Sequence, residues 1–152
     1  LYNRGMKALA PAAALGAVLA AGCTTSDSEA EIRALLAGAA EAAEARDVGF
    51  FADVIGDAYR DARGNDREQL LLAIRGYFIA NQRIDVASRI DEVVLEGTDA
   101  ARAVVHAGLL GRSGAALSDG VDAGLYRFDL ELVNDDGEWQ IIGAKWARAL
   151  GE

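Results

Sequence analysis

His106 is the side chain of this sequence best suited to acid–base chemistry near neutral pH, because it is the one histidine of the chain and imidazole titrates in that range. A general base must lie within hydrogen-bond reach of its substrate. On its predicted strand, His106 shares a side with Arg102 and Arg112, opposite an apolar row that includes Ala103 and Val105. If the apolar row faces the interior, the imidazole points to solvent. We therefore expect a surface histidine rather than a catalytic base.

Three carboxylates around Gly64 form the second candidate site. Asp57, Asp61 and Asp66 could suggest a calcium loop, but their spacing does not match the EF-hand pattern and no glutamate follows at the required offset. A polar turn followed by a helix cap explains them better. The chain has a single cysteine, which excludes a cysteine cluster for a metal and a disulfide within the chain. We expect neither a metal ion nor a cofactor.

Aromatic residues supply the third candidate site. Aromatic walls with a few polar tips are typical of small-molecule pockets, and the alternative is that these rings are ordinary core. If the hydroxyl of Tyr77 or Tyr126 reaches a cavity, it is the best group to orient a ligand. The five candidate pocket residues are Tyr59, Tyr77, Phe78, Tyr126 and Trp146.

The lone thiol, Cys23, ends an apolar N-terminal segment. Met6 and Lys7 give this segment a charged start, residues 8–21 are mostly apolar, and residues 19–23 read Leu-Ala-Ala-Gly-Cys. The run has the length of a signal peptide and falls short of the roughly 20 apolar residues that span a membrane. The motif resembles the lipobox of bacterial lipoproteins, with alanine where leucine is usual. An alanine-rich helix with a buried thiol is the alternative.

This resemblance implies that residues 1–22 are a signal peptide and that residues 23–28 form a tether lipidated on Cys23. Acyl chains on the thiol would make the membrane a partner of the protein and place it, lipid-anchored, in the cell envelope. Thr24, rather than aspartate, follows the cysteine. By resemblance to proteobacterial lipoproteins, this implies the outer membrane, facing the periplasm, if the organism is Gram-negative.

The net charge of the chain limits the classes of partner that it can bind. The chain has a formal net charge of −9, and the part after Cys23 carries 13 basic and 24 acidic residues. Nucleic-acid binding depends on neutralising phosphates with lysine and arginine, so a surface this acidic repels phosphate backbones. We therefore expect no nucleic-acid partner.

Hydrophobic spacing predicts three helices before any long strand. Apolar residues repeat at helical intervals over residues 29–45. A second, shorter helix stops at Gly56, and residues 57–64 form a polar connection. Asn65 or Asp66 caps a third helix.

Alternating residues predict an antiparallel sheet after the helices. Residues 84–95 alternate with one change of phase, which indicates a bulge or a bend near Asp91 and Glu92. Residues 101–111 form the next strand, and residues 112–122 form a loop rich in Gly, Ser and Asp.

The last two strands form a hairpin around residues 134–137, which read Asn-Asp-Asp-Gly. A type I turn with glycine at the left-handed position predicts a three-residue loop. That loop pairs Asn134 with Glu138 and puts Tyr126 opposite Trp146. On the other side of the sheet it leaves an exposed apolar strip. The strip consists of Val133, Trp139 and Ile141.

Helices followed by a bent antiparallel sheet make an α+β domain, and this order is similar to the NTF2-like (SnoaL-like) superfamily. The resemblance covers residues 29–150 and rests on the order of the elements, not on a catalytic motif. It implies a cone of N-terminal helices packed on a curved antiparallel sheet, with a pocket inside. Enzymes of the superfamily, such as ketosteroid isomerase and scytalone dehydratase, place Asp, His or Tyr there. Here the inward positions offer mainly Ser88, Tyr126 and Trp146, so the family's catalytic residues have no assignable counterparts.

Three functions remain open. The first is a membrane-tethered binding or interaction module without catalytic residues, which takes a small apolar ligand or a protein partner. The second is a small lyase or isomerase that uses the cone pocket, with Tyr126 or Tyr59 as the acid. The third is a structural envelope protein that forms a homodimer through the strip around Trp139. The lack of an inward-facing base favours the first.

Overall fold

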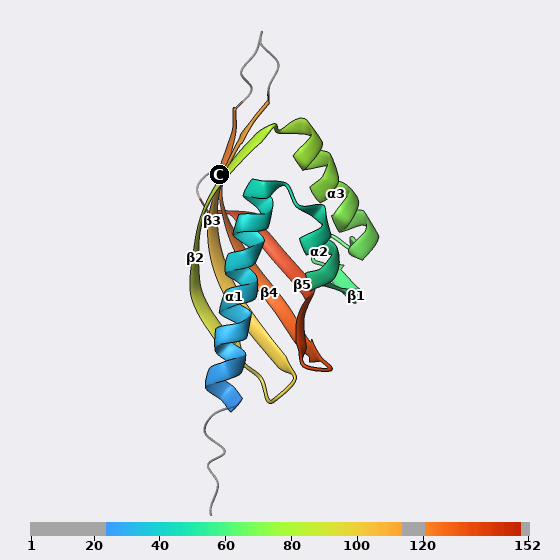
Figure 1. Ribbon diagram of the computed structural model, residues 1–152, viewed down its shortest axis with the longest axis vertical. Helices are drawn as coiled ribbons and strands as arrows, with labels where there is room; N and C mark the ends of the chain where they lie inside the picture. Colours follow the sequence, from blue (N-terminus) through green and yellow to red (C-terminus); the bar gives the residue numbers. More distant parts are fainter. Residues whose placement is uncertain (1–23, 114–120, 150–152) are drawn as a thin grey trace, which may run out of the picture.

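The computed structural model describes residues 24–113 and 121–149. The predicted signal peptide and Cys23 lie outside the described residues. Three helices come early in the chain, and long strands follow them (Figure 1). The elements in chain order are α1 (Thr24–Ala45), α2 (Val48–Val54), β1 (Ile55–Asp61), α3 (Arg67–Ala80), β2 (Arg83–Leu95), β3 (Ala100–Arg112), β4 (Val121–Asp135) and β5 (Glu138–Arg148).

The strands form one mixed sheet in the order β1-β5-β4-β3-β2. β1 runs parallel to β5, whereas the other neighbours are antiparallel. The sheet curves around α1, and α2 and α3 lie toward the β5–β1 side (Figure 1). We call the face that α1 covers the inner face and the opposite one the outer face. The predicted α+β class, with helices packed on a curved sheet, is confirmed, although the sheet is not wholly antiparallel.

β1 corrects the expectation of a polar connection over residues 57–64. The strand buries Ile55, Tyr59 and Asp61 but exposes the residues around Asp57. Its pairing with β5 is irregular, so its burial does not follow a period of two. A short edge strand that mixes charged and apolar residues lacks the alternation by which strands are recognised in a sequence.

α1 begins at Thr24, earlier than the predicted residue 29, so the segment expected to be a tether is helical from Thr24 onward. Its apolar side chains Ile32 and Leu36 are buried against the inner face of the sheet. This packing forms the main hydrophobic core. The sheet residues buried in that core are Ala101, Ala103, Val105, Leu132 and Trp139.

Short sequence patterns predicted two other features of the fold, the N-cap of α3 and the bulge in β2. Asp66 is the N-cap of α3: its carboxylate accepts a hydrogen bond from the Gln69 N–H at 2.9 Å, and the Gln69 side chain accepts one from the Asp66 N–H. The predicted bulge in β2 also exists, because pairing with β3 shifts between Ile90 and Glu92 and leaves Asp91 as the extra residue.

The β4–β5 hairpin differs from the prediction in its register. Asp136 and Gly137 both have positive φ, at 49° and 92°, which makes a two-residue turn of type I′ instead of a three-residue loop. Asn134 therefore pairs with Trp139 rather than Glu138. A bulge near Ile142 shifts the pairing once more. Tyr126 thus faces Arg148, and Trp146 faces Phe128.

These two shifts overturn the predicted outer strip. Trp139 is only 6% exposed and belongs to the core, and Ile141 packs against that core on the inner face. Val133 pairs with Gln140 on the outer face and is half-buried. The homodimer hypothesis therefore loses the surface on which it was based.

Candidate functional site

The inner face of the sheet divides into two regions along α1. Near the β4–β5 hairpin, the first half of α1 packs directly on the strands, and Ile32, Leu132 and Trp139 are all less than 7% exposed. We call this region the closed end. Toward the opposite end of β4 and β5, the helices leave the inner face partly uncovered, and we call that region the open end.

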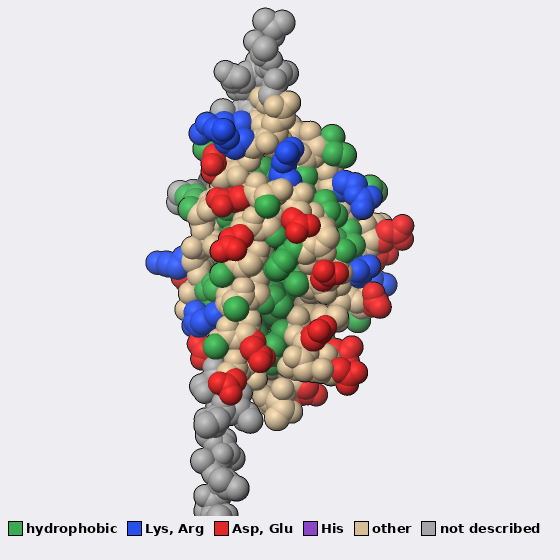
Figure 2. Space-filling view, in the orientation of Figure 1, with side chains coloured by type: hydrophobic (Ala, Val, Ile, Leu, Met, Phe, Trp, Pro, Cys, Tyr) green, Lys and Arg blue, Asp and Glu red, His purple; other side chains and the backbone are tan. Residues whose placement is uncertain are grey.

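Three aromatic side chains line the open end, and we call Tyr126, Phe128 and Trp146 the aromatic strip. The rings of Tyr126 and Phe128 have centroids 6.1 Å apart, and Trp146 pairs with Phe128 across β4 and β5. All three are half-buried. Figure 2 views the molecule from the side of the helices, and it shows hydrophobic side chains at the surface between α1 and α2.

Gly124 lets the Tyr126 ring lie flat on the sheet. A Cβ at position 124 would come within 2.5 Å of that ring, so any larger residue there would lift it. In the next row, Tyr126 lies between Ala107 of β3 and Arg148 of β5. The strip is therefore an apolar wall with a polar tip, the Tyr126 hydroxyl.

Two guanidinium groups lie over rings of the aromatic strip. The Arg63 guanidinium carbon lies 4.8 Å from the centre of the Trp146 ring, and that of Arg148 lies 5.8 Å from the centre of the Tyr126 ring. Both distances are in the range of cation–π contacts. Both arginines are exposed, so their remaining N–H groups are open to solvent.

Asp61 holds the turn that carries Arg63. Its carboxylate accepts hydrogen bonds from the Arg63 N–H at 2.8 Å, the Asn65 N–H at 2.9 Å and the Asn65 side chain at 2.8 Å. Burial by itself raises the pKa of Asp61, but the Asn65 and Arg63 donors and the Arg63 charge outweigh it and hold this pKa below its usual value. Asp61 is thus an ionised structural anchor.

The structure places the other three predicted pocket residues in different surroundings. Tyr59 is 0% exposed on β1, and burial, together with the charge of Asp61, raises the pKa of its hydroxyl. Phe78 is buried on α3 and packs against Phe51, with ring centroids 6.0 Å apart. The Tyr77 hydroxyl lies against Gly111, where a Cβ would approach it to 2.8 Å.

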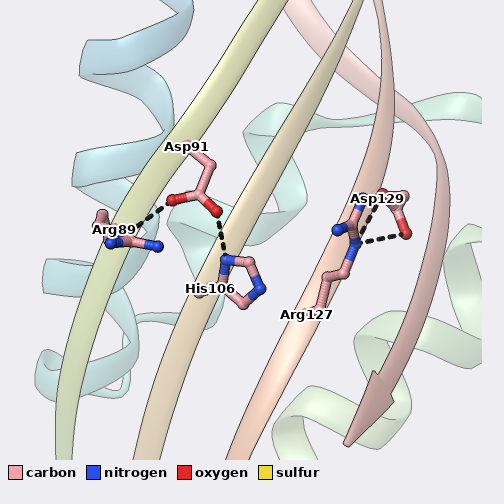
Figure 3. A network of polar contacts seen from close by, with 5 residues as sticks. All are labelled: Arg89, Asp91, His106, Arg127 and Asp129. Atoms are coloured by element: carbon pink, nitrogen blue, oxygen red, sulfur yellow. Dashed lines mark hydrogen bonds and ion pairs between the residues drawn. The ribbon is translucent and has the colours of Figure 1, made fainter. Parts of the chain in front are cut away.

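His106 lies on the outer face, as expected, and has a carboxylate partner (Figure 3). Its Nδ1 is 2.7 Å from Asp91 Oδ2, and Arg89 Nε is 2.6 Å from Asp91 Oδ1. Burial raises the pKa of Asp91, but hydrogen bonds and charge from Arg89 and His106 outweigh it and lower this pKa overall. The β2 bulge turns Asp91 toward the imidazole.

A hollow of about 300 Å³ lies beside His106. Most of its lining residues alternate onto the outer face, but Tyr126 of the aromatic strip also borders it, and Gly108 forms the floor between Ala87 and Leu125. Arg127 and Asp129 form a separate ion pair on the same face, at 2.8 Å (Figure 3). The lining residues on the outer face are Ala87, Arg89, His106, Gly108, Leu125 and Ala149.

The described residues contain neither a metal-binding cluster nor a helix that could span a membrane. Residues 24–113 and 121–149 contain no group of three or more His, Cys, Asp or Glu side chains that could hold a metal ion. None of the helices in these ranges is long and apolar enough to cross a membrane. Cys23, the predicted lipidation site, lies just before them.

Sequence reasoning missed the two arginines of the open end. Alternation could have found Arg148, because it lies two residues after Trp146 and so shares its side of β5. No local pattern identifies Arg63, because its contact depends on β1 being a strand beside β5. The place of Phe128 beside Trp146 follows from the observed register of β4 and β5.

Comparison with known proteins identifies the fold. No protein-family model and no curated protein sequence matches this chain. Solved structures do match: an NTF2-like superfamily protein from Salmonella enterica has a TM-score of 0.69 at 12% identity, over 84% of this chain and 94% of that chain. A ketosteroid isomerase-like protein from Erwinia carotovora has a TM-score of 0.66 at 18% identity, over 80% and 96% of the two chains.

A hexachlorocyclohexane dehydrochlorinase from Novosphingobium barchaimii also matches, with a TM-score of 0.69 at 13% identity over 84% of this chain and 90% of that chain. At such identities the likeness shows the fold alone. The chain therefore has the NTF2-like cone fold, which isomerase-like proteins, a dehydrochlorinase and a protein of unknown function share. Fold by itself does not identify an activity.

Proposed function

From this NTF2-like fold, we propose that the protein is a membrane-tethered, non-catalytic binding module that takes a small apolar ligand on the aromatic strip. One observation carries the proposal: the side chains of Tyr126, Phe128 and Trp146 are contiguous on the inner face and only half-buried. Apolar rings left partly uncovered favour a ligand that removes them from water.

The position of α1 supports a tethered arrangement. α1 starts at Thr24, directly after the proposed lipidation site, and its N-terminal half lies over the closed end. A helix of 22 residues is about 33 Å long at 1.5 Å per residue. The open end, at the far end of α1 (Figure 1), would then face away from the lipid and toward ligands in solution.

The surroundings of the ionisable groups favour binding over catalysis. The described part of the chain holds its Asp–His pair, Asp91 and His106, on the outer face, whereas the strip belongs to the inner face. Asp61 uses both carboxylate oxygens to hold its own turn. The Tyr59 hydroxyl is buried and stays protonated near neutral pH. The hypothesis of a lyase with Tyr59 as its acid therefore gains no support.

Phenylnaphthylamine, an uncharged apolar dye, tests the binding site. Energy transfer from tryptophan to bound dye is measured in the full chain, since both tryptophans lie in β5. We expect saturable binding that Tyr126→Ala weakens by about tenfold, the equivalent of about 1.4 kcal/mol. Leu125→Ala is the matched control, because Leu125 is the next residue on β4, is 48% exposed and lines the outer hollow.

Equal loss in both variants, or loss in Leu125→Ala alone, would place the dye on the outer face and reject the proposal. The tether is tested separately by metabolic labelling with palmitate. We expect label in the unaltered chain and none in Cys23→Ser. Label that persists in Cys23→Ser would reject lipidation at this residue.

A further inference from the structure

We propose that the open end recognises organic anions, so that an apolar ring or chain lies on the aromatic strip while a carboxylate or sulfonate group meets Arg63 and Arg148. This inference rests on the proposed function and names the ligand class of the same site. It is based on the two guanidinium groups that border the strip on β5 and on the turn after β1.

Arg63 and Arg148 form no ion pair with a carboxylate of the described residues, a feature that they share with Arg46, Arg60, Arg75 and Arg83, but they are the two arginines that lie over aromatic rings there. On the outer face, Arg89, Arg102 and Arg127 each lie within 4.0 Å of a carboxylate. In residues 24–113 and 121–149, neither Arg63 nor Arg148 forms such an ion pair. Their charge is thus left for a group that the described residues do not supply.

The nearest candidate to neutralise Arg63 is already engaged. Asp61 acts on Arg63 through its charge, but its oxygens accept N–H groups from the backbone of Arg63 and from Asn65. The Arg63 side chain extends instead over Trp146. A carboxylate that arrives from solvent would therefore find a guanidinium with free donors.

Cation–π contacts hold both guanidiniums over aromatic rings. A guanidinium held over an aromatic ring keeps its N–H donors directed along its edges, where they can form paired hydrogen bonds with a carboxylate. Arg148 shares its sheet row with Tyr126, and Arg63 lies over the neighbouring Trp146. The apolar wall and the cationic border are therefore parts of one surface.

Anion binding here would run against the charge of the whole molecule. The chain has a formal net charge of −9, which repels anions at long range. Close contacts with two stacked arginines act over shorter distances than this field, which salt screens beyond about 8 Å at physiological ionic strength. We therefore expect the affinity for anions to increase when salt rises from low to physiological concentration, until the direct contacts are themselves screened.

Two dyes that differ by one charge test the inference in the full chain. Anilinonaphthalene sulfonate and phenylnaphthylamine share their aromatic body, but only the first carries a sulfonate. We expect Arg148→Gln and Arg63→Gln each to weaken binding of the sulfonate dye by about tenfold and to change binding of the uncharged dye by less than about twofold. Arg33→Gln on α1 is the control, because it removes the same charge from a surface ion pair with Glu29.

The outcomes separate this inference from the proposed function. If the uncharged dye binds the strip but the Arg63 and Arg148 variants bind both dyes as the unaltered chain does, the anion preference is wrong and the binding module stands. A loss of the sulfonate dye in Arg33→Gln equal to that in Arg148→Gln would also reject the inference, because the effect would then follow net charge. If neither dye depends on Tyr126, both proposals fail.

Discussion

The closed end and the open end belong to the same face of the same strands, but α1 covers the closed end more completely than the open end. At the closed end, Ile32 of α1 and Leu132 of β4 are almost fully buried in the same hydrophobic core. At the open end, Tyr126 and Trp146 continue the same alternation but stay half-exposed. The sheet therefore presents one continuous apolar surface, and the placement of the helix decides which part stabilises the fold and which part can bind.

Side-chain truncation at the two ends gives the largest expected contrast. Leu132→Ala removes a side chain that is 1% exposed, and such substitutions cost about 2–5 kcal/mol of the free energy of unfolding. Trp146→Ala removes a larger side chain from the open end, where we expect a cost of about 1 kcal/mol because the ring is already partly in water. Urea unfolding measures both values.

The comparison fails if Trp146→Ala destabilises the protein as much as Leu132→Ala does. That result would mean that the aromatic strip is part of the core. The slope of unfolding against urea should stay the same in both variants, because neither alters the surface that is exposed on unfolding by much.

Glycine substitutions test the turn that brings Trp139 into the closed end. Gly137 has φ +92° in the β4–β5 turn, a conformation that costs an L-residue about 1–2 kcal/mol, so Gly137→Ala should lower the free energy of unfolding by this amount. Gly76→Ala is the control, and it should change the free energy of unfolding in the opposite direction. A Cβ at Gly76 would meet nothing within 4 Å on exposed α3, and we expect a gain of about 0.5–1 kcal/mol.

A neutral or stabilising Gly137→Ala would mean that residue 137 does not hold the positive φ on which the two-residue turn depends. Thermal unfolding followed by circular dichroism shows whether each of the two substitutions stabilises or destabilises the protein.

Regular periodicity predicted the parts of this fold that depend on it. The helical spacing of residues 29–45 and the change of phase near Asp91 each reflect contacts within one or two elements, and both features are present. β1 was missed because an edge strand with charged residues has no clear period. The β4–β5 register was missed because a turn one residue shorter and the bulge near Ile142 each move the pairing by one position.

The candidate site, too, was predictable only where its contacts depend on the periodicity of a single strand. Alternation within β4 and β5 was enough to place Tyr126 and Trp146 on the inner face. Tyr59 is buried on a strand that the sequence did not predict. Arg63 contacts Trp146 only because β1 brings its turn beside β5. Contacts between distant segments depend on the register, which a sequence pattern does not fix.

The smallest expected effect concerns the turn that holds Arg63 at the open end. Because the pKa of Asp61 is lowered in the folded protein, its contribution to stability is fully present above the usual aspartate value of about 3.9. It is lost as the pH falls through the lower folded value. Asn65→Ala removes the side-chain donor to Asp61, and we expect the pKa of Asp61 to rise toward its usual value.

Nuclear magnetic resonance of the Asp61 carboxyl group measures this change directly. In Asn65→Ala the folded pKa of Asp61 lies closer to the unfolded value, so its contribution to the free energy of unfolding is smaller. The loss of this contribution should therefore be complete at a higher pH than in the unaltered chain. Asn134→Ala is the control, because Asn134 accepts the Gly137 N–H in the distant hairpin and should leave the pKa of Asp61 unchanged. An unaltered pKa in Asn65→Ala would mean that the Asp61 turn is held by other contacts, and the position of Arg63 over Trp146 would then need a different cause.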